Sequence, residues 1–431
     1  MNNLLVRNGL VIDTEPQPTV VGTADVLVEG GRVAGVGPGL PAPADAQVID
    51  ATGMIVLPGF VDSHRHTWQP AIRAILPDAT LGDYLERILG RYAPRHRPED
   101  VYTGVLAGAL ECLDAGITTL VDWSNIQFTP EHTDANVAAL RASGIRAVFG
   151  YCYGGDGGFD GMAAEGRRVR TQHFDDSGPG LLTMAIAALG PDLGGAERAL
   201  HEWRLARDLD LPVTVHMGGL DTEAAARGLA FLRENALLDH PATHVHGTYY
   251  TDEHFKVIAG GGGTVSVAPT SEAALGMGYP PTGRARAAGV PTSLSADTVT
   301  SGPGDMFSLM RAAYLLERAR PGGAGMGFTT RDALRTATIE GAEAVGLADV
   351  TGSLRPGKQA DIVLLRTDLL GTAMAGNDPI AAVVLSGDTR CVDTVIVGGR
   401  VVKRDGRLLH HDVAGLLESL AASARHVIAA D

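Results

Sequence analysis

The sequence predicts an α/β protein, a (β/α)8 TIM-type barrel with a small β-sandwich domain formed by both chain ends. Between residues 54 and 348, eight short apolar runs rich in β-branched residues alternate with helical stretches, as in a parallel sheet covered by helices. Both chain ends instead contain alternating runs separated by turn signals. With 431 residues, the chain is long enough for a barrel of about 250 residues and a second, smaller domain.

The chain ends contain five β-strand candidates. Glycine pairs mark turns in two of them, at Gly30-Gly31 and at Gly398-Gly399, and the second pair predicts a hairpin. The candidates are Leu4–Asp13, Ala24–Val36, Gln47–Asp50, Ala360–Leu365 and Val392–Val402.

The domain boundaries follow from this pattern, because chain termini often lie close together. We expect the small β-sandwich domain to contain both ends and the barrel to occupy the middle. The expected ranges are 1–54 plus 355–410 for the β-sandwich, 55–354 for the barrel and 411–431 for a C-terminal helix.

The barrel region contains eight strand candidates with helices between them. A doubly wound open sheet is the alternative, but no Gly-x-Gly-x-x-Gly follows an early strand to indicate nucleotide binding. The strands are Ile55–Asp62, Ile117–Trp123, Arg146–Tyr151, Leu182–Leu189, Pro212–His216, Thr243–His246, Thr264–Val267 and Pro291–Asp297. Helix candidates include Glu99–Ala115, Asp134–Ser143, Glu197–Asp208 and Asp305–Arg318.

Composition excludes several classes of protein. The 35 basic and 50 acidic side chains leave a net charge of −15, which argues against a nucleic-acid or anionic-membrane binder. Cys112, Cys152 and Cys391 are too few for a disulfide framework and too widely spaced for a Cys-x-x-Cys zinc site. No run of 18 apolar residues and no signal-peptide pattern occurs. We therefore expect a cytoplasmic protein with a small-molecule substrate and with neither nucleic acid nor membrane as a partner.

Four histidines and one aspartate stand at the ends of predicted barrel strands. His64 and His66 are two residues apart at the end of the first strand, so both side chains point to the same side, as two ligands of one metal ion require. His216, His246 and Asp297 end the fifth, sixth and eighth strands. In a closed barrel these five side chains meet at one mouth, where the active sites of such barrels lie.

His244 forms a second same-face pair with His246. We prefer His246 as the functional residue because it is nearer the strand end, with Gly247 ending the run. His244 is interpreted as part of the barrel core or as a residue behind the site.

These motifs resemble the amidohydrolase superfamily, and the resemblance covers nearly the whole chain. Within the superfamily the sequence looks most like the cytosine deaminase and chlorohydrolase branch, on the basis of His246-Gly-Thr-Tyr-Tyr-Thr-Asp-Glu and of Gln69 after the first motif. The motifs that carry the resemblance are Met-Ile-Val-Leu-Pro before Gly-Phe-Val-Asp-Ser-His64-Arg-His66, then His216, His246, Asp297, and Gly-Ser-Leu-Arg-Pro-Gly-Lys-Gln-Ala-Asp361-Ile-Val.

The resemblance implies a ligand set for one divalent metal ion per chain: His64, His66, His216 and Asp297. Zinc is the first expectation, with iron and manganese as alternatives. His246 then contacts the metal-bound water or the substrate. Superfamily members commonly form homo-oligomers, and a homodimer is expected here.

The scarcity of lysine favours one metal ion over two. Binuclear members of the superfamily use a carboxylated lysine from the fourth strand, but Lys256 is the first lysine of this chain. The fourth-strand run 181–189 contains no cysteine or glutamate either.

The sequence departs from this branch at Gly219. Deaminases of the branch carry a glutamate three residues after the fifth-strand histidine, where it transfers protons, but here Met217-Gly218-Gly219 follows His216. Asp221 and Glu223 are nearby acids, which are better explained by their place at a helix start.

Three functions remain open. The first is a metal-dependent hydrolase that acts, through a metal-bound hydroxide, on a C–N bond (amide, amidine or amino-heterocycle) of a small cyclic or aromatic molecule. The second is a cyclase of the same fold that closes a benzoxazole-type ring with loss of water, which the missing glutamate favours. The third is a non-catalytic scaffold, which has no physical need for four convergent ligands.

The hydrolase hypothesis gives two residues catalytic roles. Asp297 accepts the proton of the attacking group and passes it on, and His246 polarises or hydrogen-bonds the developing oxyanion. Side chains that follow other strands are candidates for substrate binding, and their aromatic rings could stack on a flat substrate. The four predicted substrate-binding residues are Gln69, Trp123, Tyr151 and Glu272.

Overall fold

The computed structural model describes residues 3–174 and 180–428. The chain divides into two compact units, each built from several segments of the sequence. The first unit comprises Met1–Ser63, Glu111–Thr119 and Asp305–His411. The second comprises His64–Leu110, Leu120–Gly304 and Asp412–Asp431.

The first unit contains a nine-stranded sheet to which both chain ends contribute, as the sequence predicts. Its strand order is β17-β16-β15-β14-β5-β1-β2-β3, and β4 also pairs with β1. The central strand β5 is parallel to β1 and antiparallel to β14. The strands are β1 (Leu4–Asp13), β2 (Thr19–Glu29), β3 (Arg32–Gly37), β4 (Gln47–Asp50), β5 (Met54–Pro58), β14 (Ile362–Arg366), β15 (Val392–Val397), β16 (Arg400–Arg404) and β17 (Arg407–Leu408).

Turn chemistry explains where these strands end. The predicted strand 24–36 is a hairpin of β2 and β3, because Gly30 and Gly31 adopt positive φ angles of 57° and 81°. Gly398 and Gly399 do the same, at 54° and 78°, between β15 and β16. Glycine has no Cβ and adopts these angles at no steric cost. Buried side chains from the two chain ends, such as Val26 and Ile362, share one core.

Helices α10 to α13 also belong to the first unit. The predicted helix 305–318 is α10, for which the Asp305 side chain accepts a hydrogen bond from the Ser308 N–H and so serves as the N-cap. These helices are α10 (Met306–Arg318), α11 (Thr330–Thr336), α12 (Ile339–Ala344) and α13 (Pro379–Leu385).

The barrel sheet consists of eight strands in consecutive order, which confirms the predicted fold class. A parallel bridge between Arg65 and Asp297 connects the first strand to the segment after the last one. The strands are β6 (Phe60–Arg65), β7 (Ile117–Gln127), β8 (Arg146–Tyr153), β9 (Leu182–Ala188), β10 (Val213–Met217), β11 (Ala242–His246), β12 (Thr264–Val267) and β13 (Thr292–Leu294).

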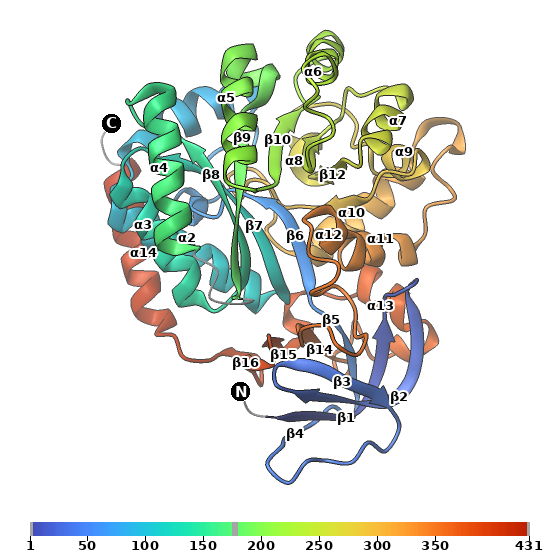
Figure 1. Ribbon diagram of the computed structural model, residues 1–431. Coiled ribbons are helices and arrows are strands. Elements are labelled where there is room, and N and C mark those ends of the chain that lie inside the picture. The colour runs from blue at the N-terminus through green and yellow to red at the C-terminus, as the bar shows by residue number, and fades with distance from the viewer. Residues whose placement is uncertain (1–2, 175–179, 429–431) are drawn as a thin grey trace. The chain divides into compact units, whose positions relative to one another are not determined.

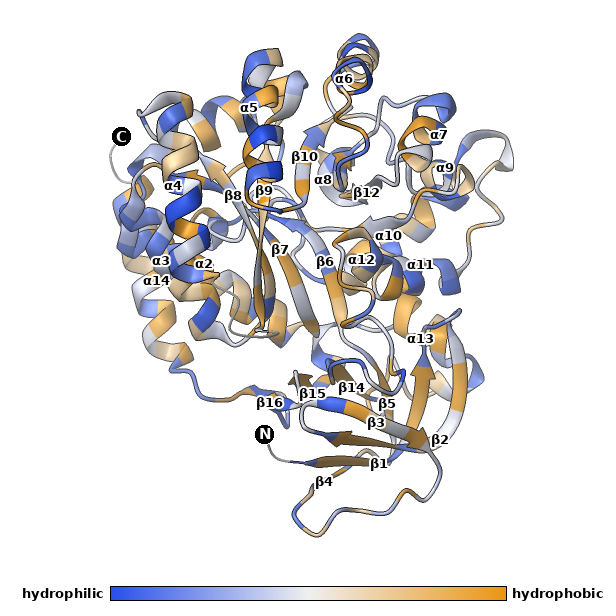
Figure 2. Cartoon of the chain, viewed as in Figure 1, coloured by the Kyte–Doolittle hydropathy of each residue, from blue (hydrophilic) through white to orange (hydrophobic). Residues whose placement is uncertain are grey.

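Helices of the second unit pack on these strands. Helix α4 contacts β8 and α5 contacts β9, and both helices can be followed beside the strands in Figure 1. Strand β9 is mainly hydrophobic, whereas α4 and α5 carry hydrophilic and hydrophobic residues in turn (Figure 2), as expected for helices with one face on a sheet. The α-helices are α1 (Leu81–Tyr84), α2 (Pro98–Asp114), α3 (Pro130–Ser143), α4 (Gly158–His173), α5 (Gly195–Asp208), α6 (Thr222–Glu234), α7 (Asp252–Gly260), α8 (Pro269–Ala274), α9 (Thr282–Ala287) and α14 (Val413–Ile428).

Several strands differ from their predicted ranges. The predicted first barrel strand 55–62 is two strands, because β5 pairs with β1 and β14 in the sheet of the first unit whereas β6 pairs with β7 in the barrel. Strand β7 continues from Trp123 to Gln127, and buried hydrogen bonds such as that from Ser124 Oγ to Asn136 Oδ1 at 2.6 Å hold polar residues of this extension. Strand β13 is shorter than predicted and ends at Leu294. The chain then turns, and Asp297 adopts a positive φ of 59°.

The C-terminal segment forms helix α14, which contacts the 3-10 helix η1 (Gln69–Ile72) that follows the first histidine motif. The last three residues of the expected 411–431 helix lie outside the described residues. Among the described residues, no helix has the length and apolar character needed to cross a membrane.

Candidate functional site

The site is built where the first and last barrel strands meet. The Asp297 N–H donates to the His64 carbonyl oxygen at 2.9 Å, and the His66 N–H donates to the Asp297 carbonyl oxygen at 2.9 Å. These two backbone hydrogen bonds place the side chains of all three residues beside one another. Asp297 and His246 both have positive φ angles, 59° and 82°, a conformation that non-glycine residues rarely adopt and that is concentrated at functional sites.

Three imidazoles and one carboxylate converge at this point. The ligand atoms of His64, His66, His216 and Asp297 all lie within 4.8 Å of one another. Asp297 Oδ1 is 3.3 Å from His64 Nε2 and 3.4 Å from His66 Nε2. His216 Nε2 is 3.2 Å from His64 Nε2. The structure therefore brings together all four side chains that the sequence predicts as metal ligands.

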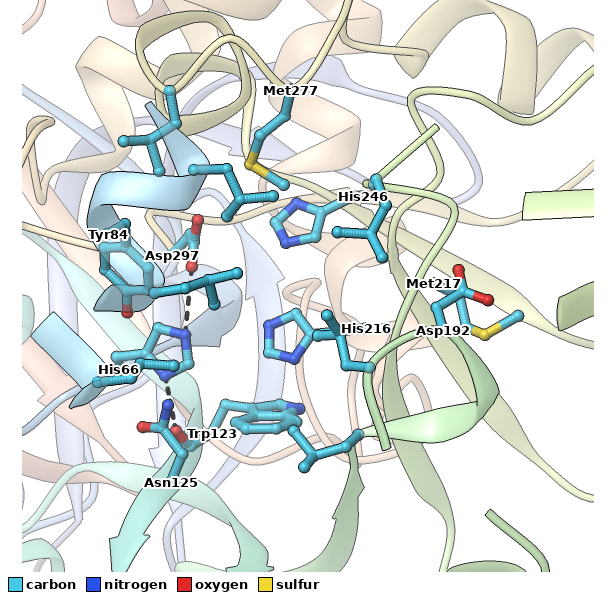
Figure 3. Close-up of a pocket in the computed structure, with 18 residues that line it drawn as sticks. His66, Tyr84, Trp123, Asn125, Asp192, His216, Met217, His246, Met277 and Asp297 are labelled. Atoms are coloured by element: carbon cyan, nitrogen blue, oxygen red, sulfur yellow. Dashed lines mark hydrogen bonds and ion pairs between the residues drawn. The ribbon is translucent and has the colours of Figure 1, made fainter. Parts of the chain in front are cut away.

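A hydrogen bond sets the orientation of one of these rings. His66 Nδ1 lies 2.9 Å from the Trp123 carbonyl oxygen, which can only accept, so Nδ1 donates and Nε2 keeps its lone pair. In Figure 3, His66 and His216 face each other across the space beneath Asp297, with Trp123 below.

Burial controls the charge of this cluster. It lowers the pKa of His64 to about 4, although the hydrogen bond and charge of Asp297 act in the opposite direction. Burial, reinforced by the neighbouring imidazoles, keeps the pKa of His216 well below its ordinary value. Burial would raise the pKa of Asp297, but its hydrogen bond with His64 and the nearby histidines hold that pKa well below its usual range.

The resulting donor set fits a divalent metal ion. Neutral imidazoles present nitrogen lone pairs and an ionised carboxylate presents oxygen, which are ligands that zinc accepts in a four-coordinate site. The Nε2 atoms of His216 and His64 face each other at 3.2 Å, a separation that suits an imidazole–imidazole hydrogen bond and that places both nitrogens within reach of one metal ion. His216 Nδ1 has no hydrogen-bond partner among the described residues.

His246 lies beside this cluster and outside the four-residue set. Its ring stacks on that of His216, with centroids 5.4 Å apart and planes at 18°. Its Nδ1 is 3.2 Å from Glu272 Oε1. Burial lowers the pKa of His246, but the hydrogen bond to Glu272 and the charges of Asp297 and Glu272 outweigh burial, so the pKa is raised above its ordinary value.

A pocket opens onto the cluster. Its floor is formed by His66, His216, His246 and Asp297. Most of its remaining lining is aliphatic or aromatic. These residues are Leu81, Tyr84, Leu85, Leu89, Trp123, Leu189, Leu193, Met217, Leu220, Leu275 and Met277, together with Asn125, Asp192 and Gly219.

Of the four predicted substrate-binding residues, Trp123 lines the pocket and the other three do not. Trp123 lines the pocket, and its ring lies 4.1 Å from that of His216. Gln69 is buried outside the pocket lining, and its side-chain amide donates to the Tyr84 hydroxyl at 2.8 Å. Tyr151 is also buried and donates to the Met162 carbonyl at 3.1 Å. Glu272 meets the site through His246, as described above.

Three polar pocket residues were not predicted from the sequence. Asn125 follows Trp123 by two positions on β7, so strand alternation could have identified it once the strand was extended. Tyr84 ends a short helix, and Asp192 lies in the π-helical turn η4 (Gly190–Gly194) after β9. Neither position carries a local signal, because long-range packing alone brings it to the pocket.

His244 lies away from the pocket lining. It is buried, and its Nδ1 is 3.0 Å from the Tyr250 hydroxyl. This position agrees with its interpretation as a residue behind the site.

The profile of the Amidohydrolase family matches residues 55–402. The chain is 30% identical to the 5-methylthioadenosine/S-adenosylhomocysteine deaminase of Desulforudis audaxviator, over 99% of each chain. It is 29% identical to the 5'-deoxyadenosine deaminase of Methanothermobacter thermautotrophicus, over 89% of this chain and 90% of the relative.

Solved structures show the same similarity. An adenosine deaminase from Xanthomonas campestris with bound zinc superposes with a TM-score of 0.87 and 26% identity, over 98% of both chains. A single-residue mutant of the atrazine chlorohydrolase TrzN from Arthrobacter aurescens, complexed with zinc and atraton, has a TM-score of 0.88 and 25% identity, over 98% of this chain and 100% of the other.

Proposed function

Because the chain belongs to the amidohydrolase family and is a hydrolase of non-peptide C–N bonds, we propose that it removes an amino group from an uncharged, flat heteroaromatic small molecule. The observation that carries this proposal is the pocket in which a three-histidine, one-aspartate cluster faces a largely apolar wall. The reaction replaces the bond between a ring carbon and its amino nitrogen by a C–O bond and releases ammonia.

We propose that His64, His66, His216 and Asp297 hold one divalent ion, with zinc as the first candidate. Such an ion acts as a Lewis acid and lowers the pKa of a bound water from 15.7 to about 7. The relatives that contain zinc support this choice.

The chain's own residues supply the proton transfers and the orientation of the substrate. We assign to Asp297 the acceptance of the proton of the attacking water, and to His246 a hydrogen bond to the oxygen that gains charge. Trp123 offers a ring face for stacking, and its indole N–H has no hydrogen-bond partner among the described residues. Asn125 and Asp192 add two polar points to the wall.

The character of the pocket wall supports an uncharged substrate. No lysine, arginine, serine or threonine is found among the described residues that line it, and the carboxylates are Asp192 and Asp297. A substrate carboxylate held against this wall, away from the histidine cluster, would have no lysine or arginine partner, and an unpaired buried charge is strongly unfavourable. The wall therefore favours a ring without a charged tail.

A matched pair of purine nucleosides tests this substrate class. 5-Methylthioadenosine and S-adenosylhomocysteine carry the same reacting ring, but the second bears an amino-acid tail with two charges. We expect kcat/KM for ammonia release to be at least tenfold higher for the first compound. A preference for S-adenosylhomocysteine would refute the proposed uncharged substrate.

The metal site is tested by elemental mass spectrometry of the purified protein. We expect about one ion per chain in the wild type and in a His410→Ala control, whose histidine is exposed and far along the chain, and loss of the ion in His216→Ala. If the wild type binds no zinc even after reconstitution, the hydrolase proposal fails and the scaffold hypothesis replaces it.

Gly219 supports one alternative function. Without a carboxylate at this position, the same cluster could promote addition of an internal nucleophile to a trigonal carbon, followed by loss of water, which closes a benzoxazole-type ring. The mass of the product distinguishes the two reactions, because hydrolysis adds water and releases ammonia whereas cyclisation only loses water.

We also propose a cytoplasmic homo-oligomer, most simply a homodimer. Cys112, Cys152 and Cys391 are all buried and form no disulfide, which suits a reducing compartment. Light scattering of the purified protein should give twice the mass of one chain, and a monomeric mass would contradict the proposed assembly.

A further inference from the structure

Gly219 lies beside His246, at the position where the resemblance predicts a proton-transferring glutamate. A Cβ at residue 219 would lie 3.4 Å from His246 Cβ and Cδ2 and 3.2 Å from the flexible end of Met277. The residue before it, Gly218, has a positive φ, but Gly219 does not, so the backbone permits a side chain there. The glutamate expected from the resemblance is therefore absent from a position that could hold it.

A different glutamate reaches the same histidine. Glu272 is fully buried in the short helix α8, and its Oε1 accepts the Ala268 N–H at 2.8 Å. The same oxygen lies 3.2 Å from His246 Nδ1. Glu272 Oε2 has no hydrogen-bond partner among the described residues. Because a carboxylate without compensation is costly to bury, the contact with His246 has a large effect on both groups.

This contact determines how the imidazole is presented. A carboxylate accepts hydrogen bonds, so His246 Nδ1 donates to it and Nε2, on the opposite side of the ring, retains a lone pair. His246 lines the pocket, next to His216 and below Met277 (Figure 3). A carboxylate behind an imidazole whose other nitrogen faces the substrate is the arrangement of general acid–base dyads.

We propose that Glu272 is the positioning residue that makes His246 the proton donor to the leaving amine, in place of a glutamate at residue 219. This inference rests on the proposed deaminase function. Asp297 takes one proton from the attacking water as its oxygen bonds to the ring carbon and the π electron pair of the ring C=N bond moves onto the ring nitrogen, from which it returns to re-form C=N when the amine leaves. His246 Nε2 receives a proton from that oxygen or from Asp297, its imidazolium is stabilised by Glu272, and it delivers the proton to the amino nitrogen. The C–N bond then breaks, ammonia leaves, and the ring carbon keeps the oxygen.

The identity of the leaving group separates this role from a structural one. An amine leaves only after it has gained a proton, whereas chloride leaves without one. The probes are 5-methylthioadenosine and its 6-chloropurine analogue, which share ring and tail. In Glu272→Gln, we expect kcat for amine release to fall at least 100-fold and kcat for chloride release to fall less than tenfold. Equal losses with both probes would overturn the proposal.

Two further variants control for folding and for charge. Glu202 is another buried glutamate, which binds the Leu189 and Gly190 N–H groups and Arg198. Glu202→Gln should change kcat for amine release and kcat for chloride release by the same factor. In the double variant Glu272→Gln/Gly219→Glu, a carboxylate returns beside His246, and we expect at least tenfold recovery of amine release. No recovery, in a double variant that still binds zinc, would contradict the proposed exchange of positions.

A measurement without substrate distinguishes a failure of this inference from a failure of the proposed function. In ¹⁵N spectra of histidine-labelled holoenzyme, with the His246 signals assigned from His246→Asn, we expect the proton of the neutral ring on Nδ1. In Glu272→Ala, we expect a mixture of tautomers at unchanged zinc content. An unchanged tautomer would overturn the positioning role, whereas wild-type inactivity on both probes with the expected tautomer shift would refute only the assigned reaction.

Discussion

Replacing Gly108 by alanine should weaken metal binding although residue 108 does not touch the metal ligands. Gly108 lies in the interior of α2, and a Cβ added there would be 2.5 Å from the Thr67 carbonyl oxygen and 2.9 Å from Thr67 Cγ2. Thr67 directly follows His66. At Gly104, one helical turn earlier, an added Cβ would similarly overlap the Trp68 carbonyl oxygen. These two glycines allow α2 to pack directly against the segment that carries a metal ligand.

The expected magnitude follows from two opposing effects. Cβ atoms are essentially never found closer than 3.0 Å to another heavy atom, so Gly108→Ala must move helix or segment by at least about half an ångström. Forcing extra volume into a packed interior costs about 1–3 kcal/mol, while alanine favours a helix over glycine by about 1 kcal/mol. Because the overlap is with a backbone carbonyl oxygen, which no change of rotamer relieves, the upper part of this range, about 2–3 kcal/mol, applies. After the helix gain is subtracted, the net strain is about 1–2 kcal/mol. If moving the His66 segment relieves this strain, zinc affinity falls by a factor of about 5–30.

Zinc affinity measured by competition with a chelator is the assay, and Gly90→Ala is the matched control. Gly90 is also helical, but an added Cβ would be 3.6 Å from the Leu85 carbonyl oxygen, an ordinary contact. We expect wild-type zinc affinity in the control and reduced affinity in Gly108→Ala, with both proteins folded by circular dichroism. Zinc affinity within twofold of the wild type in Gly108→Ala would refute this account of the α2 packing.

Two further predictions concern ionised groups in the same unit. Burial raises the pKa of Asp192 to about 6 although the Gly218 N–H donates to its carboxylate, so ionisation of Asp192 lowers the stability of the fold as the pH rises through 6. The variant Asp192→Asn should therefore have a higher melting temperature than the wild type at pH 8, by an amount corresponding to about 1–3 kcal/mol, and the same melting temperature near pH 4. Equal shifts at both pH values would contradict this prediction. Burial would raise the pKa of Asp100, but hydrogen bonds from Arg97 and Ser423 hold it at about 2, so its stabilising charge persists until the pH falls below about 4 towards 2. Ser423→Ala should therefore weaken the docking of α14 by about 1.5–3 kcal/mol at pH 7. The measurement is amide hydrogen exchange in α14, which should become faster. Unchanged exchange would show that the hydrogen bond between Ser423 and Asp100 does not stabilise the helix.

The barrel could be predicted because its strands are short apolar runs that end in polar residues. This pattern is local, so strands such as β10 and β11 were found to within a residue of their ends. The metal cluster was predictable for a related reason. His64 and His66 share a face by strand alternation, and barrel closure brings His216 and Asp297 to the same end.

The pocket wall could not be predicted because no local pattern distinguishes its residues. Leu85 and Leu89 are ordinary apolar residues of the π-helix η2 (Leu85–Tyr92), and only tertiary packing turns them towards the site. The bond between Asp100 and Ser423 joins residues 323 positions apart. For Gln69, a local pattern was present: the residue follows the His64/His66 motif, which predicts a contact with the substrate. In the structure its side chain instead forms hydrogen bonds with Tyr84 and Thr298.

The glycine at residue 219, where the resemblance predicts a glutamate, does not by itself exclude deamination. A proton-transferring group needs a position near the reacting atoms and a partner that stabilises its charged form, and neither requirement fixes a place in the chain. His246 has both: it lines the pocket, and Glu272 binds its far nitrogen. Glu272 contacts His246 Nδ1, and a Cβ at residue 219 would lie 3.4 Å from His246 Cδ2, so a carboxylate could reach this imidazole from either position. The glycine at 219 therefore changes which residue supports proton transfer, while the chemistry of the cluster stays available.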